Sequence, residues 1–160
     1  MKKISALILS ALFLTFALVG CGSDSSSKAY DLNSIVSAVE EVNPVSNARA
    51  VDDNFITLDM LLTKENIESY AGKVTNDQAD SALIVAIKAV PGKADTVKSE
   101  LESYKTSIST GGLYAEFAEK EAAAKDARIV VKGDYLVLVV ANTTGADYAA
   151  IDTALDEALK

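Results

Sequence analysis

The chain has 160 residues, with 15 basic and 23 acidic side chains, no His, no Trp and a single Cys, Cys21. These counts exclude His-based catalysis, zinc sites built on Cys or His, and disulfides within the chain. Without Lys2 and Lys3, 13 basic residues face 23 acidic ones, a formal charge of −10 that argues against nucleic acid as a partner. We therefore assign no catalytic residues, no metal ligands and no cofactor from the sequence.

The amino-terminal segment has the layout of an export signal. Lys2 and Lys3 form a short positive region, and residues 4–19 form an apolar run broken only by two Ser and one Thr. The 16 residues of this run cover ~24 Å at a rise of ~1.5 Å each, less than the ~30 Å of a bilayer core. A signal peptide over residues 1–20 is thus favoured over a membrane-spanning helix.

The apolar run ends in Leu18-Val19-Gly20-Cys21, which resembles the lipobox of bacterial lipoproteins. The resemblance implies that a diacylglyceryl group is attached to the Cys21 thiol and that a signal peptidase cuts between Gly20 and Cys21. It leaves open whether the new amine is acylated. The implied partners are the membrane, through this lipid, and the lipoprotein-processing enzymes. The implied location is outside the cytoplasm, anchored to the bacterial cell membrane. A free redox thiol is the alternative, disfavoured because no second Cys can resolve an oxidised sulfur.

Residues 21–30 are expected to be a flexible tether that carries the lipid. Gly22 to Lys28 reads GSDSSSK and offers nothing to bury. A tether of about eight residues keeps the following domain within ~20 Å of the membrane on average.

The first half of residues 31–160 mixes helical and extended patterns. We predict a helix that begins at an Asp31 cap and ends at about Val42, followed by a polar connection over residues 45–54. A strand or extended segment is expected over Phe55–Leu58, and a short helix from Thr63 to Gly72 with Leu62 and Ile67 as its hydrophobic staple. The next element is a strand over Ser81–Val90 that is apolar on both faces.

The second half contains the clearest periodicity. We predict a helix over residues 93–110 whose apolar stripe is Val97, Leu101, Tyr104 and Ile108, and a second helix over residues 113–125 whose Ala-rich face is thin. Two strands, Arg128–Lys132 and Tyr135–Ala141, are joined by a tight turn at Gly133-Asp134. A last helix follows a capping box at Thr144–Asp147 and carries on one side Tyr148, Ile151, Leu155 and Leu159.

This order of elements predicts one α+β domain over residues 31–160. We expect a small antiparallel sheet of about three strands, including a C-terminal β-hairpin, packed with about five helices. Two strands are apolar on both faces and therefore need cover on both sides. Helices or a second subunit can supply that cover, so a dimer stays open.

Several pieces of the domain resemble a family of small bacterial lipoproteins that carry a domain of unknown function. They are Ile56-Thr57-Leu58-Asp59 followed by Tyr70-Ala71-Gly72, Ala79-Asp80-Ser81-Ala82 leading into a strand, the long helix, and Gly133 to Val140. The resemblance covers residues 31–160 and departs at the Ala-rich helix after Gly112. It implies surface anchoring and one domain, but no activity, substrate or catalytic residues.

Acidic residues and tyrosines are the remaining candidates for a site. Asp52-Asp53 and the run from Asn76 to Asp80 could offer oxygen ligands to a hard cation, but neither has the Gly and distal Glu of an EF-hand loop, so solvated loops and turn caps are favoured. Six tyrosines could instead form a binding patch. Core packing is expected for three of them, Tyr104, Tyr135 and Tyr148, whereas Tyr70 and Tyr114 are left open.

These observations favour a membrane-anchored extracytoplasmic lipoprotein whose domain is a non-catalytic binding or scaffold module for an unknown envelope protein or ligand. One alternative is a hydrolase that acts on envelope material through paired carboxylates, which the absence of Trp platforms disfavours. Another alternative is a lipoprotein that binds a small solute or a cation.

Overall fold

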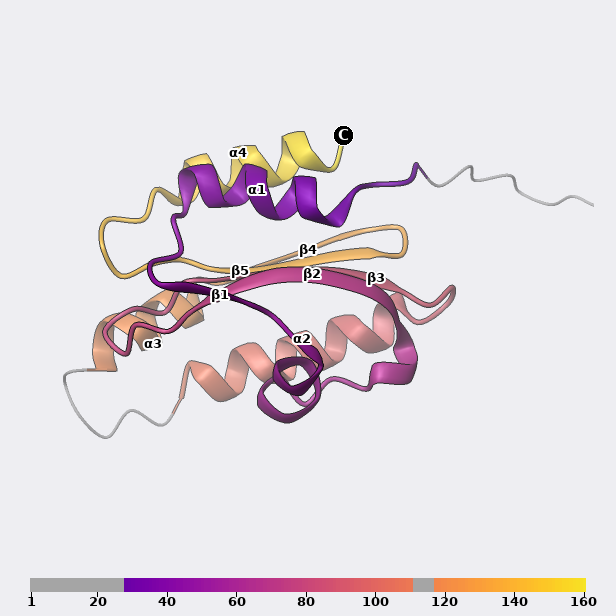
Figure 1. The fold of residues 1–160 in the computed structure, drawn as a ribbon, viewed down its shortest axis with the longest axis horizontal. Coiled ribbons are helices and arrows are strands. Elements are labelled where there is room, and N and C mark those ends of the chain that lie inside the picture. Colours follow the sequence, from indigo (N-terminus) through magenta and orange to yellow (C-terminus); the bar gives the residue numbers. More distant parts are fainter. Residues whose placement is uncertain (1–27, 111–116) are drawn as a thin grey trace, which may run out of the picture.

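The structure is a computed structural model that describes residues 28–110 and 117–160 (Figure 1). Gly20, Cys21 and Tyr114, together with the start of the helix expected over residues 113–125, lie outside the described residues.

A five-stranded antiparallel sheet forms the centre of the domain. Its strands lie in the order β1 (Ala48–Ala50), β2 (Ile67–Thr75), β3 (Leu83–Ala89), β5 (Tyr135–Val140) and β4 (Arg128–Lys132). The predicted α+β class and C-terminal hairpin are confirmed, but the expectation of about three strands is wrong. The two strands that were missed, β1 and β2, pair with each other in antiparallel register, and β2 also pairs with β3.

Helices cover both faces of the sheet (Figure 1). One face carries α1 (Leu32–Val42) and α4 (Tyr148–Ala158), and the other carries α2 (Ala94–Ile108) and α3 (Ala118–Lys125). All four α-helices were predicted. They supply the cover that the sequence left open between helices and a second subunit.

Two hydrophobic clusters, one on each face, make up the core. Successive side chains of a strand point to opposite faces, so Val85, Ile87 and Leu138 join the cluster under α2, whereas Ile84 and Val137 join the cluster under α1 and α4. This alternation explains why both central strands read as continuous apolar runs.

The segment expected as a strand at Phe55–Leu58 is instead a π-helical turn, Phe55–Asp59. The Asp52 carboxylate accepts a hydrogen bond from the Phe55 N–H at 2.8 Å, and the Met60 N–H donates to the Phe55 carbonyl at 2.9 Å. The turn buries Phe55 and Ile56. A short apolar run does not distinguish a strand from a helical turn, which is why the pattern misled the prediction.

The short helix expected from Thr63 to Gly72 is also wrong. Only Lys64–Asn66 form a 3-10 turn, after which the chain enters β2. Gly72 lies inside that strand, where a Cβ atom would be 2.6 Å from the Ile84 carbonyl oxygen and 3.0 Å from Val51. Close packing against the next strand therefore accounts for this glycine better than a helix stop does.

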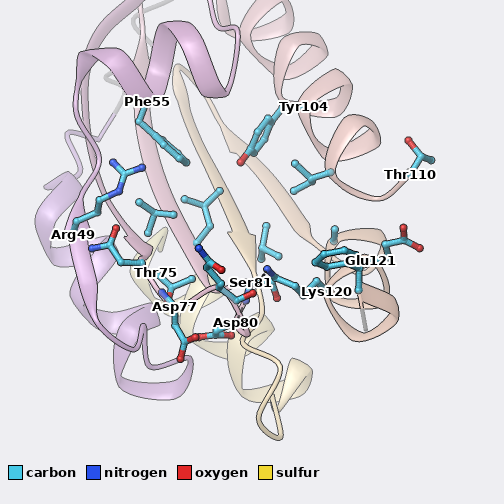
Figure 2. Close-up of a pocket in the computed structure, with 18 residues that line it drawn as sticks. Arg49, Phe55, Thr75, Asp77, Asp80, Ser81, Tyr104, Thr110, Lys120 and Glu121 are labelled. Carbon is cyan, nitrogen blue, oxygen red and sulfur yellow. Dashed lines mark hydrogen bonds between the residues drawn. The ribbon is translucent and has the colours of Figure 1, made fainter. Parts of the chain in front are cut away.

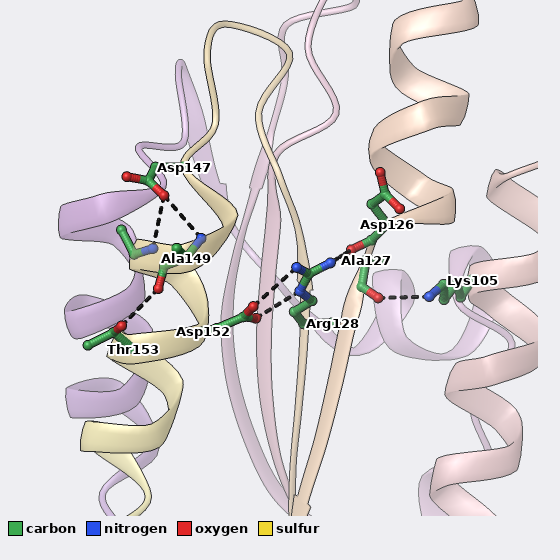
Figure 3. Close-up of polar contacts among 9 residues, drawn as sticks. Lys105, Asp126, Ala127, Arg128, Asp147, Ala149, Asp152 and Thr153 are labelled. Carbon is green, nitrogen blue, oxygen red and sulfur yellow. Dashed lines mark hydrogen bonds and ion pairs between the residues drawn. The ribbon is translucent and has the colours of Figure 1, made fainter.

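Side-chain caps define the helix starts on the α1–α4 face. Asp31 accepts from the Ser34 N–H at 2.7 Å, as predicted. Asp147 caps α4 by accepting from the N–H groups of Ala149 and Ala150 at 3.0 and 3.1 Å (Figure 3). The predicted capping box placed the cap at Thr144, three residues too early, because Asp147 takes the cap position itself.

The edge strand β4 is tied to both helical layers (Figure 3). The Arg128 guanidinium donates to the two carboxylate oxygens of Asp152 on α4 at 2.8 and 3.2 Å. It also lies 4.6 Å from the ring centroid of Tyr148. On the other face, the Lys105 ammonium of α2 donates to the Ala127 carbonyl at 2.8 Å. These contacts fix the hairpin between the layers.

Candidate functional site

A cavity of about 630 Å³ opens at one end of the domain, on the α2–α3 side of the sheet (Figure 2). Three other hollows among the described residues measure about 250 to 300 Å³. Side chains from β1, the π-helical turn, the β2–β3 loop, the end of α2 and the start of α3 line the large cavity. Its volume lies within the range of small-molecule sites.

Over the described residues, α3 contributes little side-chain bulk at this end of the sheet. Helix α3 has only eight residues and buries two alanines, Ala123 and Ala124, which fill little space. Longer side chains line the walls around this gap, and the apolar ones are Phe55, Val74, Leu83, Tyr104, Ile108, Phe117 and Val140. Polar and charged side chains complete the lining, so the cavity combines apolar and aromatic surfaces with hydrogen-bonding groups, as ligand sites do.

Tyr104 brings a polar group into this apolar lining. Its ring packs against the core, and its hydroxyl points into the cavity without a hydrogen bond to any described residue (Figure 2). Among the described residues no buried side-chain nitrogen or oxygen lacks a partner, so the hydroxyl oxygen is open to the cavity. Burial, and secondarily the charge of Asp59, raises the pKa of Tyr104 to about 12. The hydroxyl therefore stays protonated at neutral pH and can donate a hydrogen bond. The sequence predicted that Tyr104 packs in the core but did not indicate that its hydroxyl group faces a cavity.

Two cations, each lying over an aromatic ring, occupy the cavity wall. The Arg49 guanidinium lies 5.0 Å from the centroid of Phe55, and the Lys120 ammonium lies 5.8 Å from the centroid of Phe117. Lys120 also donates a hydrogen bond to the Gln78 carbonyl. Arg49 has an ion-pair contact of 4.0 Å with Asp59. Sequence reasoning did not single out either cation, because only the fold brings residues 49 and 120 to one cavity.

The acidic run from Asn76 to Asp80 forms one rim of the cavity, and its two carboxylates are engaged in local structure. Asp80 accepts from the N–H groups of Ser81 and Thr143 at 2.7 and 2.9 Å and from the Ser46 hydroxyl at 2.9 Å. Asp77 accepts from the Ala79 N–H at 2.9 Å. These are the turn and capping contacts that the sequence favoured over cation binding.

The charge state of Asp80 argues against this residue as the general acid of a hydrolase. Burial raises the pKa of this carboxyl, but hydrogen bonds from four neighbours outweigh burial and hold the pKa below the ordinary value of 3.8. An acid that stays ionised cannot donate a proton at neutral pH, which glycoside cleavage by a carboxyl pair requires.

The second acidic candidate, Asp52-Asp53, lies just before the π-helical turn and outside the cavity lining. Asp52 caps that turn, and Asp53 accepts from the Lys64 ammonium and the Tyr70 hydroxyl. Over residues 28–110 and 117–160, no group of three or more Asp, Glu, His or Cys side chains is arranged to hold a metal ion.

The other described tyrosines lie away from the cavity. Tyr30 donates to the Leu159 carbonyl at 2.9 Å and packs edge-on against Tyr135, with ring centroids 5.1 Å apart. Tyr148 lies beneath Arg128. These contacts fix helices to the sheet, so the five described tyrosines do not form one patch.

No helix among the described residues is both long enough and apolar enough to cross a bilayer. No curated protein and no solved structure shows significant similarity to the chain. The sequence profile of the domain of unknown function DUF4358 matches residues 41–141. This span confirms the expected domain of unknown function and contains the sheet, α2, α3 and the cavity. The chain therefore belongs to the DUF4358 family.

Proposed function

We propose that the protein is a lipid-anchored, extracytoplasmic binding protein whose DUF4358 domain takes up a small organic ligand in the cavity between the sheet, α2 and α3. The observation that carries the proposal is the cavity of about 630 Å³, whose wall combines apolar and aromatic side chains with polar and charged ones. Such a combination is typical of ligand sites. The lipobox at Leu18 to Cys21 supports the anchored location.

A noncatalytic role agrees with the chemistry of the cavity wall. The chain has no His, and its single Cys is Cys21. Asp80, the buried acid at the rim, is held ionised by its hydrogen bonds. The rest of the wall combines hydrogen-bond donors such as Arg49 and Lys120, the carboxylates of Asp77 and Glu121, and apolar surfaces, all of which can bind and orient a ligand.

Titration with N-phenyl-1-naphthylamine tests whether the cavity takes up a ligand. This uncharged dye gains fluorescence in apolar surroundings. It is added to a soluble form, residues 22–160, whose folding is first established by a cooperative thermal transition. We expect saturable binding at one site per chain. Val74→Trp places a larger side chain on the cavity wall and should weaken binding by about tenfold or more.

The matched control is Val131→Trp. Val131 lies on the edge strand β4 and is 38 % exposed, outside the cavity lining. This variant should bind the dye as the unmodified domain does. Binding that does not saturate, or that survives Val74→Trp in a folded domain, would contradict a ligand site in this cavity.

A further inference from the structure

We propose that the ligand of this cavity is an amphiphile with one oxyanion head, such as a carboxylate, which the Arg49 guanidinium receives while the apolar body lies against Tyr104 and Ile108. The inference rests on the proposed function, because it names the chemical class of the ligand for the same site.

Arg49 is the group with the most open hydrogen-bonding capacity in the cavity wall. A guanidinium has five N–H donors, yet that of Arg49 makes no hydrogen bond to the described residues, and its ion-pair contact with Asp59 is long, at 4.0 Å. The Phe55 ring lies 5.0 Å from the guanidinium and supports it from one side (Figure 2). A planar guanidinium held in this way can donate two parallel hydrogen bonds to the two oxygens of a carboxylate.

Two further donors surround the same space. The Tyr104 hydroxyl opens into the cavity and remains protonated. The Lys120 ammonium uses one contact on the Gln78 carbonyl and has three donors in all. A ligand that carries oxygen acceptors satisfies these groups, whereas a purely apolar ligand leaves them without partners at a cost in affinity.

Three acids, Asp77, Asp80 and Glu121, also line the cavity, but each carboxylate side chain is engaged in a contact within the protein. Both carboxylate oxygens of Asp80 already accept hydrogen bonds from Ser46, Ser81 and Thr143. Asp77 accepts from the Ala79 N–H and is exposed. The groups of the cavity wall that can still form hydrogen bonds are therefore mainly donors. They favour a ligand whose head is negatively charged and accepts hydrogen bonds.

The apolar lining sets the other half of the ligand. Tyr104 and Ile108 are four residues apart on α2 and therefore lie on one face of that helix. Together with Leu83 on β3 they form an apolar wall of the cavity. A flat or short aliphatic body fits between these surfaces, with its anionic end at Arg49.

A matched pair of dyes separates the head from the body. 1-Anilinonaphthalene-8-sulfonate is N-phenyl-1-naphthylamine with one added sulfonate. We expect the soluble form, residues 22–160, to bind the sulfonate dye about tenfold or more tightly than the uncharged one. The difference should shrink as salt rises from 20 to 500 mM, because salt screens a partly exposed ion pair.

Arg49→Gln should remove most of the preference, lowering affinity for the sulfonate dye about tenfold while changing affinity for the uncharged dye less than twofold. Arg49→Lys keeps the charge and should retain an intermediate preference. Lys132→Gln removes a positive charge from the exposed end of β4 and should change neither affinity. Displacement of the sulfonate dye by 4-phenylbutyrate, but not by 4-phenylbutanol, extends the result to a carboxylate.

The outcomes distinguish this inference from the proposed function. Equal affinity for the two dyes, or an unchanged preference in a folded Arg49→Gln domain, overturns the assignment of an anionic head and leaves the ligand site standing. Binding of neither dye overturns both. Sulfonate binding that persists in Val74→Trp at full strength places the dye outside the cavity and also overturns the inference.

Discussion

The side-chain amide of Asn43 joins the end of α1 to Val140 at the end of β5. Its Nδ2 donates to the Val140 carbonyl at 3.1 Å, and its Oδ1 accepts from the Asn142 N–H at 2.9 Å. Asn43 is fully buried. Val140 also lines the cavity. One polar side chain thus connects the end of α1 to the sheet, at the end of the domain where the cavity lies.

Asn43→Ala is expected to destabilise the domain by about 2 kcal/mol or more. The substitution leaves a carbonyl and an N–H without their partner, and unmet buried hydrogen-bonding groups cost roughly 1–3 kcal/mol each. Urea denaturation followed by circular dichroism measures the change. Asn33→Ala, on the exposed side of the same helix, is the control and should change stability by less than about 0.5 kcal/mol. Equal effects of the two substitutions would show that the Asn43 contacts are dispensable.

Val137→Asp is expected to unfold the domain. Val137 is fully buried in β5 under α1 and α4, and an unpaired buried charge costs several kcal/mol, comparable with the whole stability of a domain. The expected result is loss of the cooperative thermal transition. Val131→Asp introduces the same charge at a site that is 38 % exposed on the neighbouring strand β4 and should leave the transition in place. A folded Val137→Asp domain would contradict the observed strand pairing.

Asp80 is expected to make the domain sensitive to acid. Its pKa in the folded state lies below the ordinary value of 3.8. The stabilising contribution is therefore complete above that value and is lost as the pH falls below it toward the folded-state pKa. Urea denaturation between pH 6 and pH 2.5 should show stability falling with acid, and the fall should be smaller in Asp80→Asn.

Ser46→Ala provides an intermediate test of Asp80. It removes one of the hydrogen bonds to the carboxylate and leaves those from the Ser81 and Thr143 N–H groups. The acid-dependent loss should lie between that of the unmodified domain and that of Asp80→Asn. If all three proteins lose stability identically, Asp80 does not contribute to the acid response.

Cys21→Ala should leave the precursor without lipid and uncut. Only a thiol can form the thioether that the lipobox resemblance implies at Cys21. Intact mass spectrometry of the protein from membranes measures both the added diacylglyceryl mass and the loss of residues 1–20. Ser23→Ala, in the tether, is the control and should be processed normally. Normal maturation of Cys21→Ala would refute the lipoprotein assignment.

The sequence predicted those elements whose pattern was long or strictly periodic. The stripe of Val97, Leu101, Tyr104 and Ile108 placed α2 almost to the residue, and the continuous apolar runs placed β3 and β5. In these elements the local pattern and the tertiary packing agree.

The elements that were missed depend on contacts far along the chain. Strand β2 carries the polar stretch Glu68-Ser69-Tyr70 and a glycine, and it is a strand because β1 and β3 pair with its two sides. The cavity was missed for a similar reason. Arg49 and Lys120 are 71 positions apart in the sequence, and no local pattern relates them.

The direction of β5 also separates the cavity from the start of the described domain. Tyr30, which follows the tether, packs against Tyr135 at the start of β5, whereas the cavity is lined by Val140 at its other end. Five residues of strand separate the two by ~17 Å. Under the proposed anchoring at Cys21, the chain would therefore lead to the membrane from the end of the domain opposite the cavity.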